Sequence, residues 1–356
     1  TTIEGGVVVA GTSQALGSGA IVLNGGTISG DSGGESRVLS NSIVLSDTST
    51  MDGGTGGLVL NGTLQLGDDS TLRVAHQVEI SGQILSGTLN KGGDGTLVLS
   101  GTSNTYTGGT KVMEGTLALA NDSALPSGNI TLSGGDLKAQ FSSSELVADG
   151  TTQLTRNITN NISVTGDAGL NGGGSGGLVI NGIVDLGGGT RVLIVGGTVS
   201  VNGQIADGGD GVGGLVKAGS GRLLLTNENL YSGDTEIREG ELRTSNNLAL
   251  GRNGNLIISG GSLNLAENLA VHGLVVSGGQ AGSESPGTGG ILSVDGNIDA
   301  RAGVINVVLA DGSGAASLVK SGSGTVVLNN ANQYSGGTTL ADGTLVVGND
   351  DALSSG

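Results

Sequence analysis

The chain has 356 residues and a formal net charge of −17, with no cysteine, no tryptophan, one phenylalanine and three tyrosines. The lack of cysteine excludes disulfides and Cys-ligated metals, and the excess of acidic side chains argues against nucleic acid or an anionic membrane surface as a partner. With 74 glycines and so few aromatics, any core must be built from small aliphatic side chains, repeated many times.

Short strands separated by turns are predicted from the first residues onward. In chain order, the patterns GAIVLNGGTIS, GGLVLNGTLQL and SGQI begin at residues 19, 56 and 81, and a similar pattern to each returns later. Apolar residues alternate with Thr, Ser or Asn over three to five positions, which is a strand pattern, and the Gly, Asn and Ser between them form turns. The strands expected at 97–99 and 117–119 start 20 residues apart.

No helix and no membrane insertion are expected for this segment. Sustained helical spacing with caps is not found, and no apolar run approaches the ~20 residues of a membrane-spanning helix. The first residues, TTIEGGVVVAGTS, lack the basic region of a signal peptide.

A longer pattern is superimposed on the short one. It occupies residues 89–128, 215–254 and 318–356, and residues 1–19 match its second half. Aligning the copies divides the chain into long repeats at 1–109, 110–234 and 235–337, with a partial fourth at 338–356. We therefore expect residues 1–356 to form one β-helix segment, cut from a longer array.

The short period predicts a parallel β-helix, an all-β solenoid. A strand that returns after roughly 20 residues can pair in parallel with its equivalent one coil earlier, at a rise of ~4.8 Å. Alternate residues then point inward and form ladders of Val, Leu and Ile. A β-sandwich is the alternative fold, but it needs longer alternating strands and usually an aromatic core. Disorder does not require apolar residues that recur in register.

The long repeat has the form L-x-K-x-G-x-G, then L-x-L, N-x-Y-x-G-x-T and G-x-L. Its matching residues in the third copy are Lys320, Gly322, Gly324, Leu328, Asn332, Tyr334, Gly336, Thr338, Gly343 and Leu345. This motif resembles the passenger-associated transport repeat, or autotransporter-associated β-strand repeat, of type V secreted proteins in Gram-negative bacteria. The second copy departs from the pattern at Asp234 and Glu241.

The resemblance implies a right-handed, single-stranded parallel β-helical passenger that is exported and displayed at the cell surface or released. It also implies that the repeats help the passenger to fold as it emerges. The residues expected to form the structural repeat motif are Lys91, Gly95, Tyr106, Gly108, Gly115, Lys217, Gly221, Tyr231, Gly233, Gly240, Lys320, Gly324, Tyr334, Gly336 and Gly343.

Structural roles are expected for the recurring tyrosines and lysines. Each tyrosine is expected on the flank of its coil, covering core aliphatic side chains, with its hydroxyl meeting water or a backbone group. Sugar-stacking platforms are the alternative, but the tyrosines would lie roughly 25 Å apart, too far to share a pocket. Each lysine is expected to pack its stem along the coil, because a phosphate-binding loop would need a following helix.

No catalytic residue, cofactor or metal is expected. Glu114, Glu239 and Asp342 share one repeat position, about 25 Å apart, so they are expected to be solvated turn acids rather than an acid–base pair. Asp94 and Asp210, in GGDG, match half of a calcium-binding nonapeptide, but the full pattern does not recur every nine residues.

The remaining candidate residues are isolated. His76 and His272 have no paired ligands and are expected at the surface. Three asparagines in N-x-[ST] strings are expected to arise by chance; they are Asn129, Asn157 and Asn161.

The function predicted from the sequence is a non-enzymatic stalk of a surface-displayed autotransporter. It would support adhesion or autoaggregation through host or neighbouring-cell surface molecules or self-association. Two alternatives stay open. One is a carbohydrate-active β-helix enzyme, for which the loop 279–290 with Glu284 is the candidate site; the other is an inert spacer.

Overall fold

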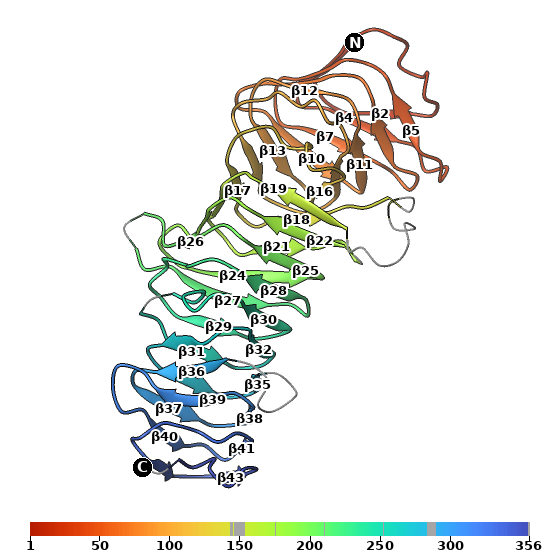
Figure 1. The fold of residues 1–356 in the computed structure, drawn as a ribbon. Coiled ribbons are helices and arrows are strands. Elements are labelled where there is room, and N and C mark those ends of the chain that lie inside the picture. The colour runs from red at the N-terminus through yellow and green to blue at the C-terminus, as the bar shows by residue number, and fades with distance from the viewer. Residues whose placement is uncertain are drawn as a thin grey trace. The chain divides into compact units, whose positions relative to one another are not determined.

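Two compact units, Thr1–Leu178 (unit 1) and Val179–Gly356 (unit 2), make up the chain. Their strands run from red to green and from green to blue in Figure 1. All strand pairings described are parallel. The computed structural model describes residues 1–142, 145, 154–174, 176–209, 211–251, 253–282 and 290–354.

Unit 1 is built from three stacked parallel sheets, here called 1A, 1B and 1C. Sheet 1A contains β1 Thr2–Ile3, β3 Ile21–Leu23, β6 Ile43–Leu45, β9 Leu64–Leu66 and β12 Ile84–Leu85. Sheet 1B contains β2 Val7–Ala10, β4 Thr27–Gly30, β7 Ser49–Asp52, β10 Thr71–Ala75, β13 Leu89–Gly92, β15 Thr110–Val112, β17 Ile130–Leu132 and β20 Ile162–Val164. Sheet 1C contains β5 Arg37–Leu39, β8 Leu58–Leu60, β11 Gln77–Ile80, β14 Thr96–Leu99, β16 Thr116–Leu119, β18 Asp136–Ala139 and β21 Ala168–Asn171. Beyond these sheets, β19 Thr155–Ile158 pairs with β22 Gly177–Ile180.

The core of unit 1 is a set of aliphatic ladders. In sheet 1C, Val78 pairs with Leu97, Leu97 with Leu117 and Leu117 with Leu137, and all four are fully buried. Each fully buried aliphatic side chain contributes about 1.5–3 kcal/mol relative to exposure. The 20-residue spacing read from the sequence is therefore the distance along the chain between paired strands.

Unit 2 repeats this construction in sheets 2A, 2B and 2C. Sheet 2A contains β24 Thr190–Gly196, β27 Gly214–Ala218, β29 Thr235–Ile237, β31 Leu256–Ile258, β34 Leu274–Val276, β37 Asn297–Ala300, β40 Ser317–Lys320 and β42 Thr338–Leu340. Sheet 2B contains β25 Thr198–Val201, β28 Arg222–Leu225, β30 Glu241–Thr244, β32 Ser262–Leu265, β35 Gln280–Ala281, β38 Gly303–Ile305, β41 Thr325–Leu328 and β43 Thr344–Val347. Sheet 2C contains β33 Leu269–Val271, β36 Ile291–Val294 and β39 Val308–Asp311. In addition, β23 Val184–Asp185 pairs in parallel with β26 Ile205–Ala206.

Most coils contribute one strand to each of three sheets, but in the first two copies of the long repeat two successive coils contribute only two strands each. In unit 2 the chain passes from β28 through the segment of Tyr231 directly to β29. The same happens in unit 1, where the segment of Tyr106 joins β14 to β15 and no described strand follows β12 in sheet 1A. The tyrosine segment therefore occupies the position of the third strand.

The predicted fold class, an all-β parallel β-helix, is confirmed. The long-repeat boundaries stay a prediction. The coils that lack a third strand keep a length of about 20 residues, so the missing strands leave no trace in the spacing of the sequence.

Candidate functional site

The lysine of each long repeat is buried under backbone carbonyls. Lys91 is 0% exposed, and its Nζ donates to the carbonyls of Gly92 (3.3 Å), Gly93 (2.5 Å) and Glu114 (2.8 Å). Glu114 belongs to the next coil, so the ammonium group ties two coils together. An ammonium has three N–H donors, and here three acceptors meet it.

The other two lysines make the same contacts. Lys217 donates to the carbonyls of Ala218, Gly219 and Glu239 at 2.7–3.1 Å, and Lys320 donates to those of Ser321, Gly322 and Asp342 at 2.6–2.9 Å. Both are 0% exposed. The expectation that each lysine packs its stem along the coil named no partner for the ammonium group; in the structure, backbone carbonyls of two coils accept its hydrogen bonds.

Burial changes the acidity of two of these lysines. Desolvation lowers the pKa of Lys91 to about 8, although the charge of Glu114 acts in the opposite direction. Desolvation likewise lowers the pKa of Lys217 to about 8, and Glu239 opposes it. Both lysines therefore still carry their proton near neutral pH, so each ammonium group has the three N–H donors that its three carbonyl acceptors require.

A glycine completes each lysine site. Gly115 has φ of +59°, which disfavours any side chain. A Cβ at Gly115 would lie 2.5 Å from the carbonyl oxygen of Gly93 and 2.6 Å from Nζ of Lys91. Gly240 and Gly343 have the same positive φ and the same neighbours in their own copies. Glycine is therefore needed at this position of the repeat, because any side chain would collide with the lysine and with the carbonyls that bind it.

The three tyrosines are core residues. Tyr106, Tyr231 and Tyr334 are at most 1% exposed, which corrects the expectation that they cover the flank of the coil. All three hydroxyls meet a side chain, since they lie 2.6–2.7 Å from Oγ1 of the threonine four residues later, which is Thr110, Thr235 and Thr338. Tyr231 also has a backbone partner of the expected kind, Gly251.

An asparagine two residues before each tyrosine links three successive coils. In the first repeat, Nδ2 of Asn104 donates to the carbonyl of Ala124 (2.7 Å), one coil later. Its Oδ1 accepts the amide N–H of Ile84 (2.7 Å), one coil earlier. Asn229 and Asn332 repeat both bonds, with Ala249 and Ile205 and with Ala352 and Leu309.

Sequence reasoning did not identify this asparagine bridge. Asn332 was noted as a motif position, but no role was inferred for it or for Asn104 and Asn229. The signal was available, because an asparagine that recurs two residues before the tyrosine in each copy lies on the same inward-facing side of an extended segment.

The remaining glycines of the motif allow close contact between coils. The amide N–H of Gly108 donates to the carbonyl of Gly87 (2.8 Å), and a Cβ there would lie 2.0 Å from Oγ1 of Thr88. At Gly233 and Gly336 a Cβ would approach a carbonyl oxygen of the previous coil to 2.5 Å. Gly95, Gly221 and Gly324 likewise face the previous coil, with Cβ distances of 2.2–2.8 Å to its backbone or side chain.

The acids and histidines singled out from the sequence lie apart. Glu114, Glu239 and Asp342 are exposed turn residues, as are His76 and His272. Oε2 of Glu114 accepts the amide N–H of Gly93 (2.7 Å), and Nδ1 of His76 lies 2.7 Å from Oδ1 of Asp52. Within the described part of the chain, no group of three or more His, Cys, Asp or Glu could hold a metal ion.

Two of the predicted candidates fall outside the described residues; they are Asp210 and Glu284. Asp94 is exposed, and among the three asparagines of the N-x-[ST] strings Asn129 and Asn161 are exposed while Asn157 is half-buried. Asn157 has a structural partner, since its amide N–H and Nδ2 both donate to the carboxylate of Asp122 at 3.0 Å.

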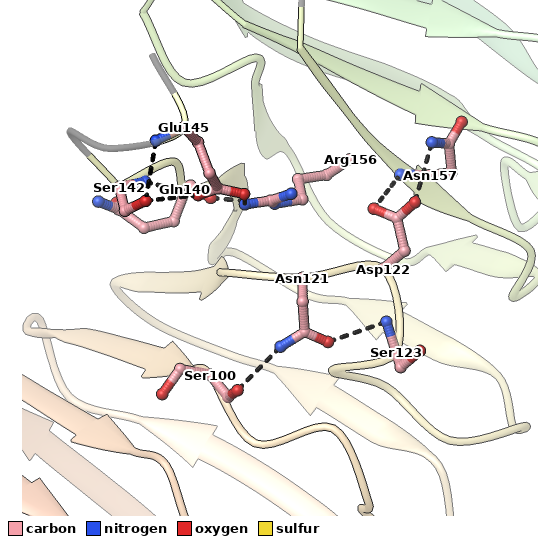
Figure 2. A network of polar contacts seen from close by, with 9 residues as sticks. All are labelled: Ser100, Asn121, Asp122, Ser123, Gln140, Ser142, Glu145, Arg156 and Asn157. Atoms are coloured by element: carbon pink, nitrogen blue, oxygen red, sulfur yellow. Dashed lines mark hydrogen bonds and ion pairs between the residues drawn. The ribbon is translucent and has the colours of Figure 1, made fainter. Parts of the chain in front are cut away.

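Figure 2 shows the polar network that follows the first repeat in unit 1. Arg156 is buried, lies 4.6 Å from the ring centroid of Phe141, and donates from Nε to the carbonyl of Gln140 and from NH2 to Glu145. The backbone N–H of Ser142, followed by the Arg156 guanidinium, lowers the pKa of Glu145 to about 2. This network ties Arg156 at the start of β19 to Gln140 and Glu145.

Among the described residues, the lysines and tyrosines of the repeats are not accessible as reactive groups. The lysines and tyrosines are buried and fully bonded, and they lie in separate coils. Their geometry can hold coils in register, and it offers no pocket in which a nucleophile and a base meet.

The comparisons with known proteins agree with the repeats. The family model for the passenger-associated-transport-repeat matches residues 89–119, 215–243 and 318–347. The three segments are passenger-associated transport repeats. Each match runs from the buried lysine to the strand after the glycine that faces it. The resemblance seen in the sequence, including that to autotransporter passengers, is confirmed.

One curated relative is an autotransporter. Over 135 residues, 37% of this chain, the sequence is 36% identical to the Adhesin BmaC autotransporter of Brucella suis biovar 1 (strain 1330). That stretch covers only 4% of the relative's own length. No solved structure matches the chain. Among the described residues, no helix has the length and apolarity needed to cross a membrane.

Proposed function

We propose that the chain is a non-enzymatic β-helical segment of an autotransporter passenger, displayed on or released from the surface of a Gram-negative bacterium. The observation that carries this proposal is the presence of three passenger-associated transport repeats within a parallel β-helix. The similarity to an autotransporter named as an adhesin favours a role in adhesion or autoaggregation.

The described contacts support a scaffolding role for the repeats. Each repeat places a buried lysine, an asparagine and a tyrosine where a coil has only two strands. The asparagine and the lysine bond to neighbouring coils, so they replace the strand hydrogen bonds that the coil lacks. A stalk that must project binding surfaces from the cell needs coils that stay stacked.

The same contacts suit folding during export. Coils of a solenoid contact only their neighbours, so a completed coil can template the next one as the chain emerges. Because the carbonyl of Ala124 receives the bond from Asn104 only when the following coil has formed, the repeats would mark points at which successive coils become fixed.

The test uses the full-length protein in its own bacterium. Residues 1–356 are deleted in frame, and display of the remaining protein is checked with an antibody on intact cells. Loss of adhesion or clumping with display retained supports the proposal. Loss of polysaccharide degradation with adhesion retained would instead point to an enzyme, and no change in either would leave only the role of a spacer.

A further inference from the structure

The second repeat differs from the others in the residue before its tyrosine. It has Leu230, where the first repeat has Thr105 and the third has Gln333. Leu230 is 39% exposed, although leucine is an apolar residue on a face where its counterparts are polar.

A second outward position of the same repeat shows the same change. Leu248 stands where the first and third repeats have Ser123 and Asp351, and it is 41% exposed. The two leucines lie on adjacent coils, because the amide N–H of Asn229 donates to the carbonyl of Leu248 (3.0 Å). The other two repeats show that the coil folds without apolar side chains at these positions, so stability does not explain the leucines.

Leu248 is at the wall of a depression of about 390 Å³ within unit 2. This volume lies within the range of small binding pockets. Its lining consists of Leu248, Leu250, Gly251, Ala270 and Val271, with the carboxylates of Glu228 and Asp295. The described lining thus combines an apolar floor with two acidic side chains and no basic one.

In the first repeat, polar contacts are found around Ser123, the counterpart of Leu248. Asp122, next to Ser123, accepts two hydrogen bonds from Asn157 of the following strand β19 (Figure 2). In the second repeat Asn247 replaces Asp122, and the strand that follows, β33, presents Ala270, which is exposed and has no side-chain hydrogen-bonding group.

From this comparison we infer that the depression lined by Leu248, together with Leu230 exposed on the adjacent coil, is a docking site for a protein segment in which an apolar side chain stands next to lysine or arginine. The apolar side chain would cover the two leucines, and the cation would lie near Glu228 and Asp295. A second copy of this chain is a poor occupant, because each copy has a net charge of −17 and only 14 basic residues.

The test measures binding of labelled synthetic peptides to the complete purified chain by fluorescence anisotropy. The probe alternates lysine and leucine; one comparison peptide alternates glutamate and leucine, and another alternates lysine and serine. We expect the lysine–leucine peptide to bind at least tenfold more tightly than either of the others, since the site requires both the apolar and the basic component.

The variants use residues that the chain itself accepts at these positions. Leu230→Thr with Leu248→Ser reproduces the first repeat, and should weaken binding of the lysine–leucine peptide about tenfold. The matched control is Ile194→Thr, which removes a 52% exposed apolar side chain from β24 and should leave the affinity unchanged. Glu228→Gln should weaken binding and reduce its dependence on salt.

Three results would overturn the inference. One is equal binding of the lysine–leucine peptide to the double variant and to the parent. Another is equal loss of binding in the Ile194→Thr control, which would indicate general charge attraction. The third is a concentration-dependent dimer of the parent that the double variant loses, which would assign the surface to a second copy. Circular dichroism and the thermal midpoint of the double variant show that it is folded.

Discussion

At the scale of single residues, the repeats depend on burying a charge that remains fully hydrogen-bonded. A buried ammonium is costly unless its donors are satisfied. Lys91 meets this condition with three carbonyls from two coils. The lysine therefore acts as a connector between backbone segments rather than as a surface charge.

Replacing Lys91 by methionine should destabilise unit 1 strongly. Methionine keeps the shape of the side chain but leaves three carbonyl acceptors without a donor, at a cost of about 3 kcal/mol or more in the free energy of unfolding. The measurement is the urea midpoint by circular dichroism. Lys111→Met is the matched control, because Lys111 lies exposed on β15; equal midpoints for the two variants would contradict the role given to Lys91.

Lys217 and the buried tyrosines should give unit 2 a stability maximum at alkaline pH. The pKa of Lys217 is lowered from 10.5 to about 8, so between these values the unfolded chain binds the proton that the native chain has lost. The free energy of unfolding from this group then rises with pH. Burial, opposed by the hydrogen bonds with Thr235 and with the backbone of Gly251, raises the pKa of Tyr231 from 10.0 to about 12. Above pH 10 the unfolded tyrosine therefore ionises first, and the free energy of unfolding falls.

The pH profile is measured as the urea midpoint of the parent chain and of two variants. Lys217→Met should remove much of the increase in the urea midpoint between pH 8 and 10, whatever the stability of this variant at neutral pH. Tyr231→Phe should make the fall above pH 10 shallower. A parent midpoint that declines steadily from pH 8 upward would show that the pKa of Lys217 is not lowered.

At the scale of a strand or turn, the sequence predicted the regular elements and missed the irregular one. Leu97 and Leu117 could be paired from spacing alone, because inward aliphatic residues must recur once per coil. The burial of Lys91 could not be predicted, since its acceptors are backbone carbonyls that carry no residue-specific signal. Only a structure shows that the segment of Tyr106 replaces a strand.

Removing one asparagine bridge should loosen the neighbouring coils locally. In Asn229→Ala, the amide N–H of Ile205 loses its acceptor and the carbonyl of Ala249 loses its donor, with an expected loss of about 2 kcal/mol or more. Hydrogen exchange should report it as faster exchange at Ile205. Asn227→Ala is the control, because Asn227 is exposed and bonds to the carbonyl of Asn202 at the surface.

At the scale of the whole molecule, the units are assembled by repetition, and register is the property that repetition must preserve. A sheet that is buried on one face loses its core if a strand slips by one residue, because every side chain then changes face. In unit 1 Ile21 pairs with Ile43, and Ile43 pairs with Leu64. Each coil therefore presents the same inward positions to the coil before it and the coil after it.

This register predicts that a whole coil can be removed from unit 1 without loss of the fold. Deleting residues 43–63 joins Ser42 to Leu64, which brings Ile21 opposite Leu64 and Leu39 opposite Ile80. In both of these new pairs the partners are aliphatic residues that already face the core, so the core contacts between neighbouring coils are kept. The control deletes only residues 43–53, which removes β6 and β7 but keeps β8. β8 can then no longer pair with β5 at its native distance along the chain. We expect the first deletion to unfold cooperatively in urea, with a midpoint close to that of the parent, and the second to lose the cooperative transition. A similar loss in both would mean that unit 1 depends on contacts beyond neighbouring coils.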